Sequence, residues 1–413
     1  MKRVVVVGGG AAGCMAAYSA AACGAQVTVL EKMAAVGRKM LIAGKGRCNV
    51  TNDCDIATFI KNMPGNGQFL YSALHAFSGN DLRTFLEEWG VPTKTERGGR
   101  VFPVSDQARD VVAAFEKALR RKGVDVRTGE AVKEIRLEDG RTVGVVTKQD
   151  KFYSADAVIL TTGGASYPGT GSSGDGYRLA ADAGHTVVPL RPSLVPLEVA
   201  EDWITDLQGL SLKNVAATVY HGQRSAASDF GELLFTHFGL SGPIILSLSG
   251  HAAEALLRPE AGEVLIGINL KPALSAEQLD KRVQRDFTSF ARKQFKNSLN
   301  DLLPAKLIGV IVDLSHIDPD KPVHQVTREE RARLVGLLQQ LTFTVTATRP
   351  ISEAIVTAGG VNTREISPGT MASKLVPGLY FAGEVIDIDG YTGGFNLQAA
   401  FSTGYVAGRS AAE

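Results

Sequence analysis

A glycine pattern near the N-terminus constrains this chain more than any other feature. Gly8, Gly10 and Gly13 follow the apolar residues 4–7 and open a run of small residues at 11–22. A strand, a tight glycine turn and a helix in this order are typical of the first β-α-β unit of a dinucleotide-binding fold. The first glycine permits the turn, the second lets the backbone approach a pyrophosphate, and the third lets the helix lie close on the sheet. We therefore expect an adenine dinucleotide at residues 8–13.

An acidic residue narrows the choice of dinucleotide. Glu31 ends the next apolar run, residues 26–31, eighteen positions beyond Gly13. A carboxylate at this place accepts hydrogen bonds from an adenosine ribose and repels a 2′-phosphate, which favours FAD or NAD over NADP. The N–H groups at the start of the helix, at Ala11 and Ala12, suit the pyrophosphate.

The C-terminal segment favours FAD over NAD. Residues 378–384 (GLYFAGE) indicate a short buried strand that ends in glycine and Glu384, and two glycines at 393–394 precede a helix expected from Phe395 to about Ala411. Glu384 suits hydrogen bonds from ribityl hydroxyls, and the helix N-terminus suits the flavin pyrimidine edge, where negative charge accumulates on reduction. The two ends of the chain together predict tightly bound FAD. Taken alone, the C-terminal segment also fits an ordinary strand-to-helix turn.

Two further loops carry residues that suit a dinucleotide. Residues 37–52 alternate glycine with Lys, Arg, Asn and Thr, which supplies main-chain donors and cations, although a solvated basic loop has the same composition. Residues 158–176 indicate a buried strand followed by a long glycine loop. The residues expected to contact FAD are Gly8, Gly10, Ala11, Ala12, Gly13, Glu31, Lys32, Arg38, Lys39, Gly46, Arg47, Asn49, Thr51, Val132, Thr162, Gly163, Gly164, Tyr167, Gly383, Glu384, Gly394, Asn396 and Leu397.

Composition limits the classes of partner. The net charge is +1, so we expect a small-molecule substrate and no nucleic-acid or membrane partner. The four cysteines lack the paired spacing of zinc sites, so no metal is expected, and they fit a cytoplasmic protein. The apolar residues 4–30 after Met1-Lys2-Arg3 faintly resemble a secretory signal, but three glycines interrupt them and they end in a strand pattern. The oligomeric state stays open.

The order of strand-prone, helix-prone and glycine-rich segments along the chain indicates that the first domain is interrupted by an insert. We expect an FAD-binding domain at 1–190 and 350–413, a mainly β insert at 191–274 and 341–349, and a small helical insert at 275–340. In the first domain, four β-prone runs between residues 125 and 154 indicate an antiparallel meander. The β-prone runs at 186–190, 216–220 and 263–270 are expected in the inserted β domain.

The helical insert is expected to open at Ser275. This serine is a suitable N-cap, but Glu277 follows after two residues rather than the three of a full capping box. Apolar residues then recur at near-helical spacing at Leu279, Val283 and Phe287. Basic residues accumulate between positions 281 and 296, where a solvated helix face is expected and a nucleic-acid contact is the alternative.

Four motifs carry a resemblance to a known family. They are GKGRCNVTN at 44–52, LFTHFGLSGP at 234–243, TAGGVN at 357–362 and GEVIDIDGYTGGFN at 383–396. Together they resemble the BaiN/YhiN family of bacterial flavoproteins nearly end to end. The resemblance implies a Rossmann-like FAD-binding domain of the glutathione reductase type, interrupted by a β-barrel that carries a small helical insert. It also implies NAD(P)H-dependent reduction of conjugated double bonds in bile acid derivatives in one branch, whereas other members carry an aminoacetone oxidase label.

Catalytic residues are harder to assign. Lys45 and Tyr391, from loops expected beside the flavin, and His237, from the insert, are candidate proton donors. Cys48 and Cys54 invite comparison with the redox disulfide of glutathione reductase, but five residues separate them instead of four and no histidine lies in the C-terminal segment. A packing role for Cys48 is therefore favoured.

The expected activity is reduction by a nicotinamide. No second nucleotide fingerprint occurs, so NAD(P)H is expected to dock transiently against the flavin, which then reduces an unsaturated organic substrate. Activity does not follow from fold alone. An amine oxidase that uses oxygen, and a flavin-dependent RNA-modifying protein that contacts RNA through residues 281–296, are the alternatives.

Overall fold

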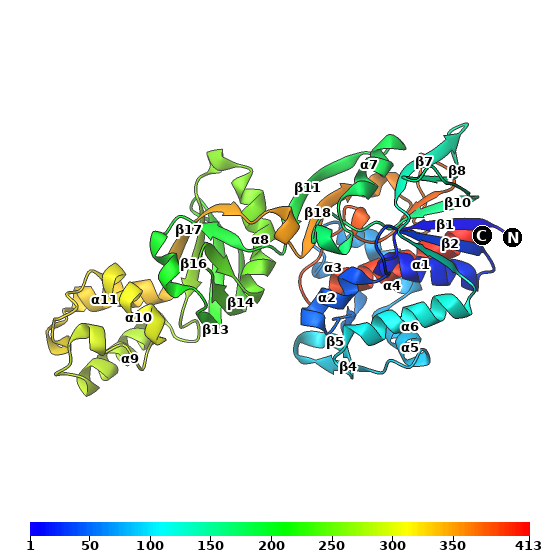
Figure 1. Ribbon diagram of the computed structural model, residues 1–413. Coiled ribbons are helices and arrows are strands. Elements are labelled where there is room, and N and C mark those ends of the chain that lie inside the picture. The colour runs from blue at the N-terminus through cyan, green and yellow to red at the C-terminus, as the bar shows by residue number, and fades with distance from the viewer. The chain divides into compact units, whose positions relative to one another are not determined.

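The computed structural model describes residues 1–413 and divides into two compact units (Figure 1). Unit 1 contains Met1–Ser193 and Ile351–Glu413, and unit 2 contains Leu194–Pro350. The chain thus leaves unit 1, forms unit 2 as one continuous segment, and returns. No helix in the structure has the length and apolar character needed to cross a membrane.

A five-stranded parallel sheet forms the centre of unit 1. Its order is β19 (Leu379–Phe381), β10 (Ala157–Leu160), β1 (Arg3–Val7), β2 (Gln26–Glu31) and β6 (Asp125–Thr128). All four neighbouring pairs are parallel. The side chains of β10 and most of β1 are buried, as expected for strands that are covered on both faces. The parallel sheet confirms the predicted Rossmann-like fold.

Two helices of small residues bring the ends of the chain together. Helix α1 (Ala11–Ala22) and helix α12 (Phe395–Ala412) lie side by side, blue against red in Figure 1. A Cβ atom on Gly404 would overlap the Ala12 carbonyl oxygen, and one on Gly408 would overlap that of Ala16. The close packing therefore depends on glycine in α12.

The predicted antiparallel meander is wrong for its first run. Residues 125–128 form β6, which pairs in parallel with β2 from Thr28↔Asp125 onwards. They follow α6 (Ala108–Arg121), so helix and strand make a crossover connection onto the parallel sheet. The remaining three runs do form an antiparallel sheet, β7 (Val132–Glu138), β8 (Arg141–Thr147) and β9 (Phe152–Ser154).

The other elements of unit 1 surround this sheet. They are α2 (Arg38–Gly46), β3 (Thr51–Asn52), α3 (Ile56–Lys61), α4 (Tyr71–Ala76), α5 (Gly79–Glu88), β4 (Thr93–Glu96), β5 (Arg100–Pro103), α7 (Asp175–Asp182), β11 (Val187–Ser193) and β18 (Val356–Val361). Strand β11 pairs antiparallel with β18. The β-prone run at 186–190 therefore belongs to unit 1 and not to the inserted β domain, because its pairing partner lies beyond the insert in sequence.

Unit 2 is built on a closed barrel. The strand order is β12 (Leu197–Val199), β15 (Gly239–Ser241), β14 (Arg224–Phe235), β13 (Ser211–His221), β16 (Val264–Asn269) and β17 (Leu341–Thr348). Helix α8 (Pro243–Leu256) packs on these strands. Phe235, Ile266 and Phe343 are buried in the barrel core. The barrel confirms that part of the predicted fold.

The helical insert lies between β16 and β17. It consists of α9 (Ala276–Ser289), α10 (Ala305–Ser315) and α11 (Arg328–Gln339). Leu279, Val283 and Phe287 of α9 are buried, as their spacing predicts. Ser275 caps α9 in a full capping box, which the sequence reasoning missed because the reciprocal partner is the amide of Gln278 rather than an acid.

Candidate cofactor site

The glycine turn after β1 has the conformation that its sequence predicts. Gly8 has φ of +105°, and the hydroxyl of Thr161 donates a hydrogen bond of 2.8 Å to its carbonyl. A Cβ atom on Gly13 would overlap that same carbonyl oxygen. On Gly10, by contrast, a Cβ would meet nothing within 4 Å. Gly10 therefore borders open space, whereas Gly8 and Gly13 are required by packing within the chain.

Two of the helices without a side-chain cap begin at predicted cofactor residues. Gly10 is the N-cap of α1 and Gly394 that of α12, and neither supplies a side-chain acceptor. The first N–H groups of a helix have no partner within the helix, so they are free to bind an anion. Ala11 and Ala12 carry such groups in α1. In α12, Phe395 begins the helix and Leu397 lies in its first turn.

Glu31 organises the glycine turn. Its two carboxylate oxygens accept hydrogen bonds from the backbone N–H groups of Gly9 and Met33, each at 2.7 Å. A carboxylate has about four acceptor positions, so these bonds leave capacity for ribose hydroxyls. Glu31, which is predicted to bind the ribose, therefore also fixes the backbone of the glycine turn.

The C-terminal segment meets the N-terminal fingerprint directly. Gly383 has φ of +77°, and a Cβ there would come within 2.8 Å of the Ala12 Cβ. The next residue, Glu384, accepts hydrogen bonds from the Lys39 ammonium at 2.7 Å and from the Thr357 N–H at 2.8 Å. Two segments that lie far apart in sequence therefore meet beside the start of α1.

Ser166 completes this cluster of polar groups. Its hydroxyl donates to Glu384 at 3.1 Å and accepts from Lys39 at 2.7 Å. Sequence reasoning predicted Lys39 and Glu384 but missed Ser166 and Thr357. The only available signal for Thr357 was its place at the start of the TAGGVN motif, and nothing in the sequence distinguished Ser166 from other serines in glycine-rich segments.

The segment at 37–52 differs from the expected open loop. It starts as helix α2, but Ala43, Gly44 and Lys45 leave helical geometry. Lys45 and Cys48 both have φ of +60°, which is rare for residues with side chains. A non-glycine residue in such a conformation costs about 1–3 kcal/mol, and such residues cluster at ligand sites.

The end of this segment contacts the start of α12. The Asn52 amide donates to the Gly393 carbonyl at 3.0 Å, and a Cβ on Gly394 would overlap the Thr51 carbonyl oxygen. The Asn396 side chain bonds both backbone groups of Gly390 and so holds the turn that precedes α12.

Some of the predicted cofactor residues carry buried polar atoms that are unsatisfied within the chain. Nine buried side-chain atoms lack a hydrogen-bond partner, and four of them belong to Arg38, Asn49, Thr51 and Thr162. An unpaired buried group costs about 1–3 kcal/mol, so a bound polar ligand would relieve each of them. A fifth atom belongs to Glu130, which was not predicted although it lies two residues before Val132. With the uncapped helix starts and the space at Gly10, the donor and acceptor set fits FAD.

Several predicted cofactor residues already have partners within the chain. Arg47 bonds Glu96 and Asp106, with 2.5 Å to the latter, and lies 4.0 Å from the Phe102 ring centroid. These bonds from Arg47 hold the pKa of Glu96 below its ordinary value. Lys32 forms an ion pair with Asp175 at 2.6 Å.

The glycine loop after β10 carries the remaining predicted contacts. A Cβ on Gly164 would lie 2.8 Å from a carboxylate oxygen of Glu384, so glycine is needed for this approach. Gly163 and Tyr167 both have positive φ, and the Tyr167 side chain is 39% exposed. Gly46 also has positive φ, and Val132 is buried at the start of β7.

The cysteines lack the properties of a redox pair. All four are free, and Cys48 is fully buried. Burial raises the pKa of Cys48 to about 12 and that of Cys54 to about 11. Both are therefore thiols at neutral pH, whereas the thiolate is the reactive form.

The three candidate proton donors are divided between the units. Lys45 is exposed, and the Tyr391 backbone N–H donates to the Asn62 carbonyl at 2.9 Å, both in unit 1. His237 is in unit 2, exposed, with its ring edge-on to Phe238 at 5.0 Å. No group of three or more His, Cys, Asp or Glu side chains is arranged to hold a metal ion.

Comparison with known proteins places the chain in a family. The model described as "HI0933-like protein Rossmann domain" matches residues 2–410. The 3-dehydro-bile acid delta(4,6)-reductase of Clostridium scindens is 35% identical, with 100% of both chains covered. The ribosomal RNA dihydrouridine synthase of Haemophilus influenzae is 31% identical, with 98% of this chain and 97% of the relative covered.

A solved structure shows the same fold. The open conformation of a flavocytochrome c3 fumarate reductase has a TM-score of 0.53 at 17% identity, covering 100% of this chain and 78% of the other. The family match spans nearly every residue, and the two relatives align over almost their whole length. This chain therefore belongs to the HI0933-like family of FAD-dependent, Rossmann-fold oxidoreductases.

Proposed function

We propose that this protein uses FAD and NAD(P)H to reduce a carbon–carbon double bond that is conjugated to a carbonyl group. The observation that carries the proposal is the chemistry common to its two relatives. The double bonds of a 3-dehydro-delta(4,6) bile acid are conjugated to the C3 ketone. Dihydrouridine is uridine reduced at C5–C6, a double bond conjugated to the C4 carbonyl. Different substrates thus require the same hydride addition.

Each predicted region of the site has a task in holding the cofactor. Bound FAD supplies the two-electron hydride chemistry. We assign the pyrophosphate to Gly10 and the start of α1, and the adenosine ribose to Glu31. The Lys39, Ser166 and Glu384 cluster is assigned to the ribityl side, where its hydrogen-bonding groups meet the sugar hydroxyls. The uncapped start of α12 is assigned to the pyrimidine edge, because a helix N-terminus favours negative charge.

The reaction also needs a proton at the carbon of the reduced double bond that does not receive the hydride. Lys45 and Tyr391 are the proposed donors from unit 1, and His237 is the one from unit 2. The variants Lys45→Gln, Tyr391→Phe and His237→Gln test the three donors one at a time. Loss of the true donor slows substrate reduction but leaves reduction of the flavin by nicotinamide intact.

The test is anaerobic and has two stages. NADH or NADPH is mixed with the FAD-loaded protein, and at least one of them should bleach the oxidised flavin spectrum. A 3-oxo-4,6-diene bile acid is then added, and the spectrum should return while the product gains two hydrogens per reduced double bond. Failure of both nicotinamides to bleach the flavin would contradict the proposal. Peroxide formation from an amine without nicotinamide would instead support the oxidase alternative.

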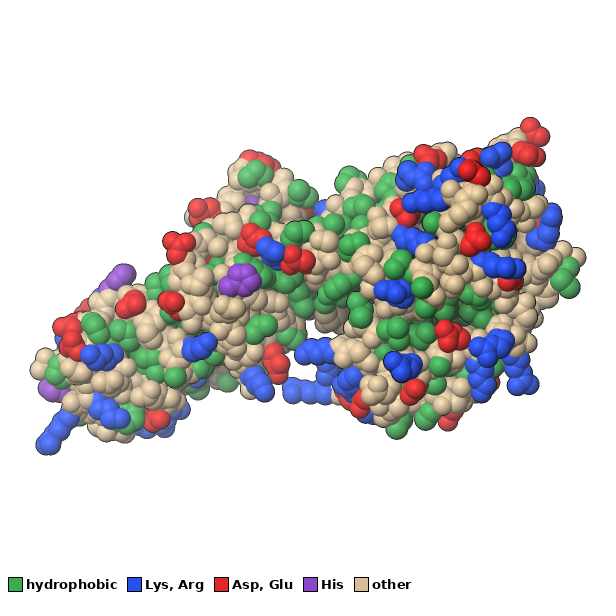
Figure 2. Space-filling model, in the orientation of Figure 1, with side chains coloured by type: hydrophobic (Ala, Val, Ile, Leu, Met, Phe, Trp, Pro, Cys, Tyr) green, Lys and Arg blue, Asp and Glu red, His purple; other side chains and the backbone are tan.

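A uridine in ribosomal RNA is the second candidate substrate, so the expectation of no nucleic-acid partner stays untested. Lys281 and Arg292 of the helical insert are exposed and form no ion pair, and the Lys293 ammonium lies 4.0 Å above the Phe290 ring. Other cations there are neutralised, such as Arg331 by Asp280. On the face in Figure 2, Lys and Arg are interspersed with Asp and Glu over the insert, at the left end of Figure 1, which limits any long-range attraction to RNA.

The RNA candidate has its own assay. Unmodified ribosomal RNA is incubated with the reduced protein, and dihydrouridine is measured by mass spectrometry of the nucleosides. Lys281→Glu with Arg292→Glu should weaken RNA reduction and leave bile acid reduction unchanged. The absence of dihydrouridine under conditions that reduce the bile acid would exclude this candidate. In either case we expect the reaction in a reducing cytoplasm, which the four free cysteines suit.

A further inference from the structure

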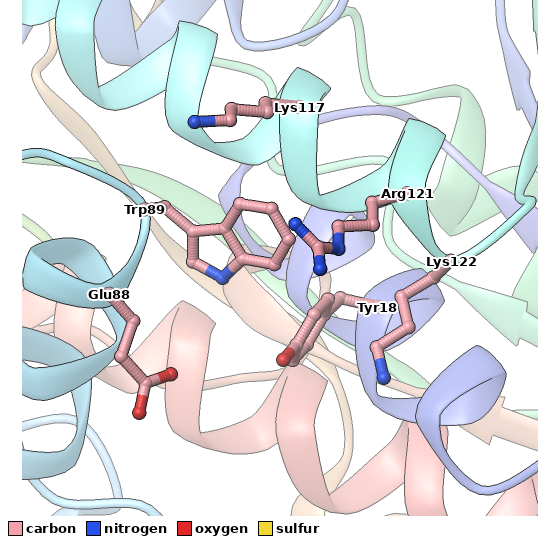
Figure 3. Close-up of a pocket in the computed structure, with 6 residues that line it drawn as sticks. All are labelled: Tyr18, Glu88, Trp89, Lys117, Arg121 and Lys122. Carbon is pink, nitrogen blue, oxygen red and sulfur yellow. The ribbon is translucent and has the colours of Figure 1, made fainter.

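A cavity lies in unit 1, away from the predicted cofactor site. It has a volume of about 370 Å³ and is lined by Tyr18 of α1, Glu88 and Trp89 at the end of α5, and Lys117, Arg121 and Lys122 of α6 and its C-cap (Figure 3). Lys122 precedes the amino end of β6 by three residues, whereas the glycine turn follows the carboxyl end of β1. Because the two strands run in the same direction, the cavity and the turn lie toward opposite edges of the sheet.

Cations dominate one side of this cavity. Lys117, Arg121 and Lys122 form no ion pair, and Glu88 is the one acid in the lining. Basic residues in the last turn of a helix are favoured by its dipole, which by itself explains Arg121 and Lys122. It does not explain Lys117, which lies one turn earlier and also lines the cavity.

Aromatic rings form the other side. The rings of Tyr18 and Trp89 are 6.2 Å apart, and Tyr18 also packs edge-on against Phe85 at 5.0 Å. Phe85 in turn contacts the buried Phe115 at 5.0 Å, so this wall rests on the core. The buried indole N–H of Trp89 has no hydrogen-bond partner. Figure 3 shows the indole between Lys117 and Glu88, with the Arg121 guanidinium beside its six-membered ring.

We propose that this cavity binds a nucleoside phosphate. The three cations would take the phosphate, the Trp89 and Tyr18 rings would contact the base, and Glu88 would accept from a ribose hydroxyl. Arginine and lysine bind phosphate well, and aromatic side chains accept any base because every base has a π-face. Such a site is distinct from the FAD site and serves a free nucleotide or a nucleotide within RNA.

Trp89 itself can report binding. The chain has two tryptophans, and Trp203→Phe leaves Trp89 as the single indole while keeping a ring against Phe343. AMP is titrated into the FAD-loaded protein at constant ionic strength, so that the adenosine half of the cofactor site is already filled. Trp89 emission should change and saturate. Inorganic phosphate alone should bind more weakly, because it lacks a ring.

Charge variants decide whether the cavity is responsible. Lys117→Gln with Arg121→Gln should weaken AMP binding about tenfold or more, since charged hydrogen bonds are lost. Arg120→Gln is the matched control, because Arg120 is exposed on the same helix and does not line the cavity. Lys122→Gln gives an independent check, and the melting temperature of every variant shows that it is folded.

The outcomes distinguish RNA from a free nucleotide as the ligand. They also distinguish failure of this inference from failure of the proposed reductase activity. A short single-stranded RNA that displaces AMP and binds more tightly identifies RNA as the source, whereas AMP binding without RNA competition identifies a free nucleotide. No saturable response to AMP or RNA, or an equal loss in the Arg120→Gln control, would overturn the inference. Bleaching of the flavin by NAD(P)H should be unchanged in the double variant, so failure here is distinguishable from failure of the proposed reductase activity.

Discussion

Two helices of the helical insert begin differently from the two helices at the predicted cofactor site. In the helical insert of unit 2, α9 and α11 both begin with a complete capping box, Ser275 with Gln278 and Thr327 with Glu330. In unit 1, α1 and α12 begin at glycine with no side-chain cap. Eight of the nine unsatisfied buried polar atoms also belong to unit 1, the exception being one of Glu201. Most of the buried side-chain atoms that a ligand could satisfy therefore lie in unit 1.

The largest expected effect is on the stability of unit 2, whose barrel core is held by packed side chains. Phe343 is fully buried and contacts the rings of Trp203 and Phe235. Phe343→Ala should lower the free energy of unfolding of unit 2 by about 3–5 kcal/mol, because a cavity remains in the barrel core. Denaturant unfolding followed by circular dichroism measures this loss. The spectrum of bound flavin should stay the same, and loss of flavin from the folded variant would break the contrast between the units.

The next largest effect is on FAD affinity, and it tests whether the cofactor occupies the open space at Gly10. Its φ is −77° and a Cβ there meets no protein atom, so Gly10→Ala should fold normally. The methyl group would occupy the proposed path of the pyrophosphate and cost about 1.5–3 kcal/mol of binding, or about 10- to 150-fold in the FAD dissociation constant. Gly250→Ala in α8 is the control, because its Cβ also meets no atom. Wild-type FAD affinity in Gly10→Ala would show that no ligand passes there.

A smaller effect is expected at the Lys39–Glu384 pair. Its side chains are 29% and 19% exposed, so solvent screens it only partly. Glu384→Gln keeps an acceptor for Thr357 but removes the charge beside Lys39, and it should weaken FAD binding about tenfold. Fluorescence of released flavin during dilution measures the change. Glu254→Gln, from an exposed pair with Arg258 in unit 2, should have no effect.

The smallest effect concerns a polar group of unit 1 that is satisfied within the chain. The His185 ring bonds Glu365 at 3.1 Å and Ser373 at 2.8 Å. Burial lowers the pKa of His185 below its ordinary value of 6.5, against the opposing influence of the Glu365 carboxylate. The unfolded imidazole therefore takes up a proton at a higher pH than the folded one. Its contribution to stability is complete above about pH 6.5 and declines as the pH falls below it.

Melting curves across this pH range check the prediction. The melting temperature of unit 1 should fall on acidification, and His185→Gln should show a shallower fall from a lower starting value. An unchanged slope in the variant would mean that other groups cause the acid sensitivity. FAD binding at neutral pH should be unaffected, since His185 is outside the proposed cofactor contacts.

The local sequence pattern was sufficient to predict the first β-α-β unit. Periodicity and the glycine spacing predicted the bounds of α1 and the end of β2 at Glu31, and the final helix was one residue longer than expected. The sequence pattern also predicted a β insert and a helical insert, and the family resemblance added that the β insert is a barrel. Each of these features can be recognised from one continuous segment or motif of the sequence, without knowing which distant residues it contacts.

Only the tertiary structure decided which distant groups meet. The sequence predicted that β6 and β11 are strands. No local pattern specifies that β6 pairs in parallel with β2, or that β11 pairs antiparallel with β18 from beyond unit 2. The sequence likewise predicted Lys39 and Glu384 separately, whereas in the folded chain they bond each other directly and Ser166 and Thr357 add further hydrogen bonds. Hydrogen bonds across hundreds of residues, and buried atoms left without them, exist only once the sheet has formed. For that reason the glycine pattern identifies the class of cofactor, and the fold selects the side chains around it.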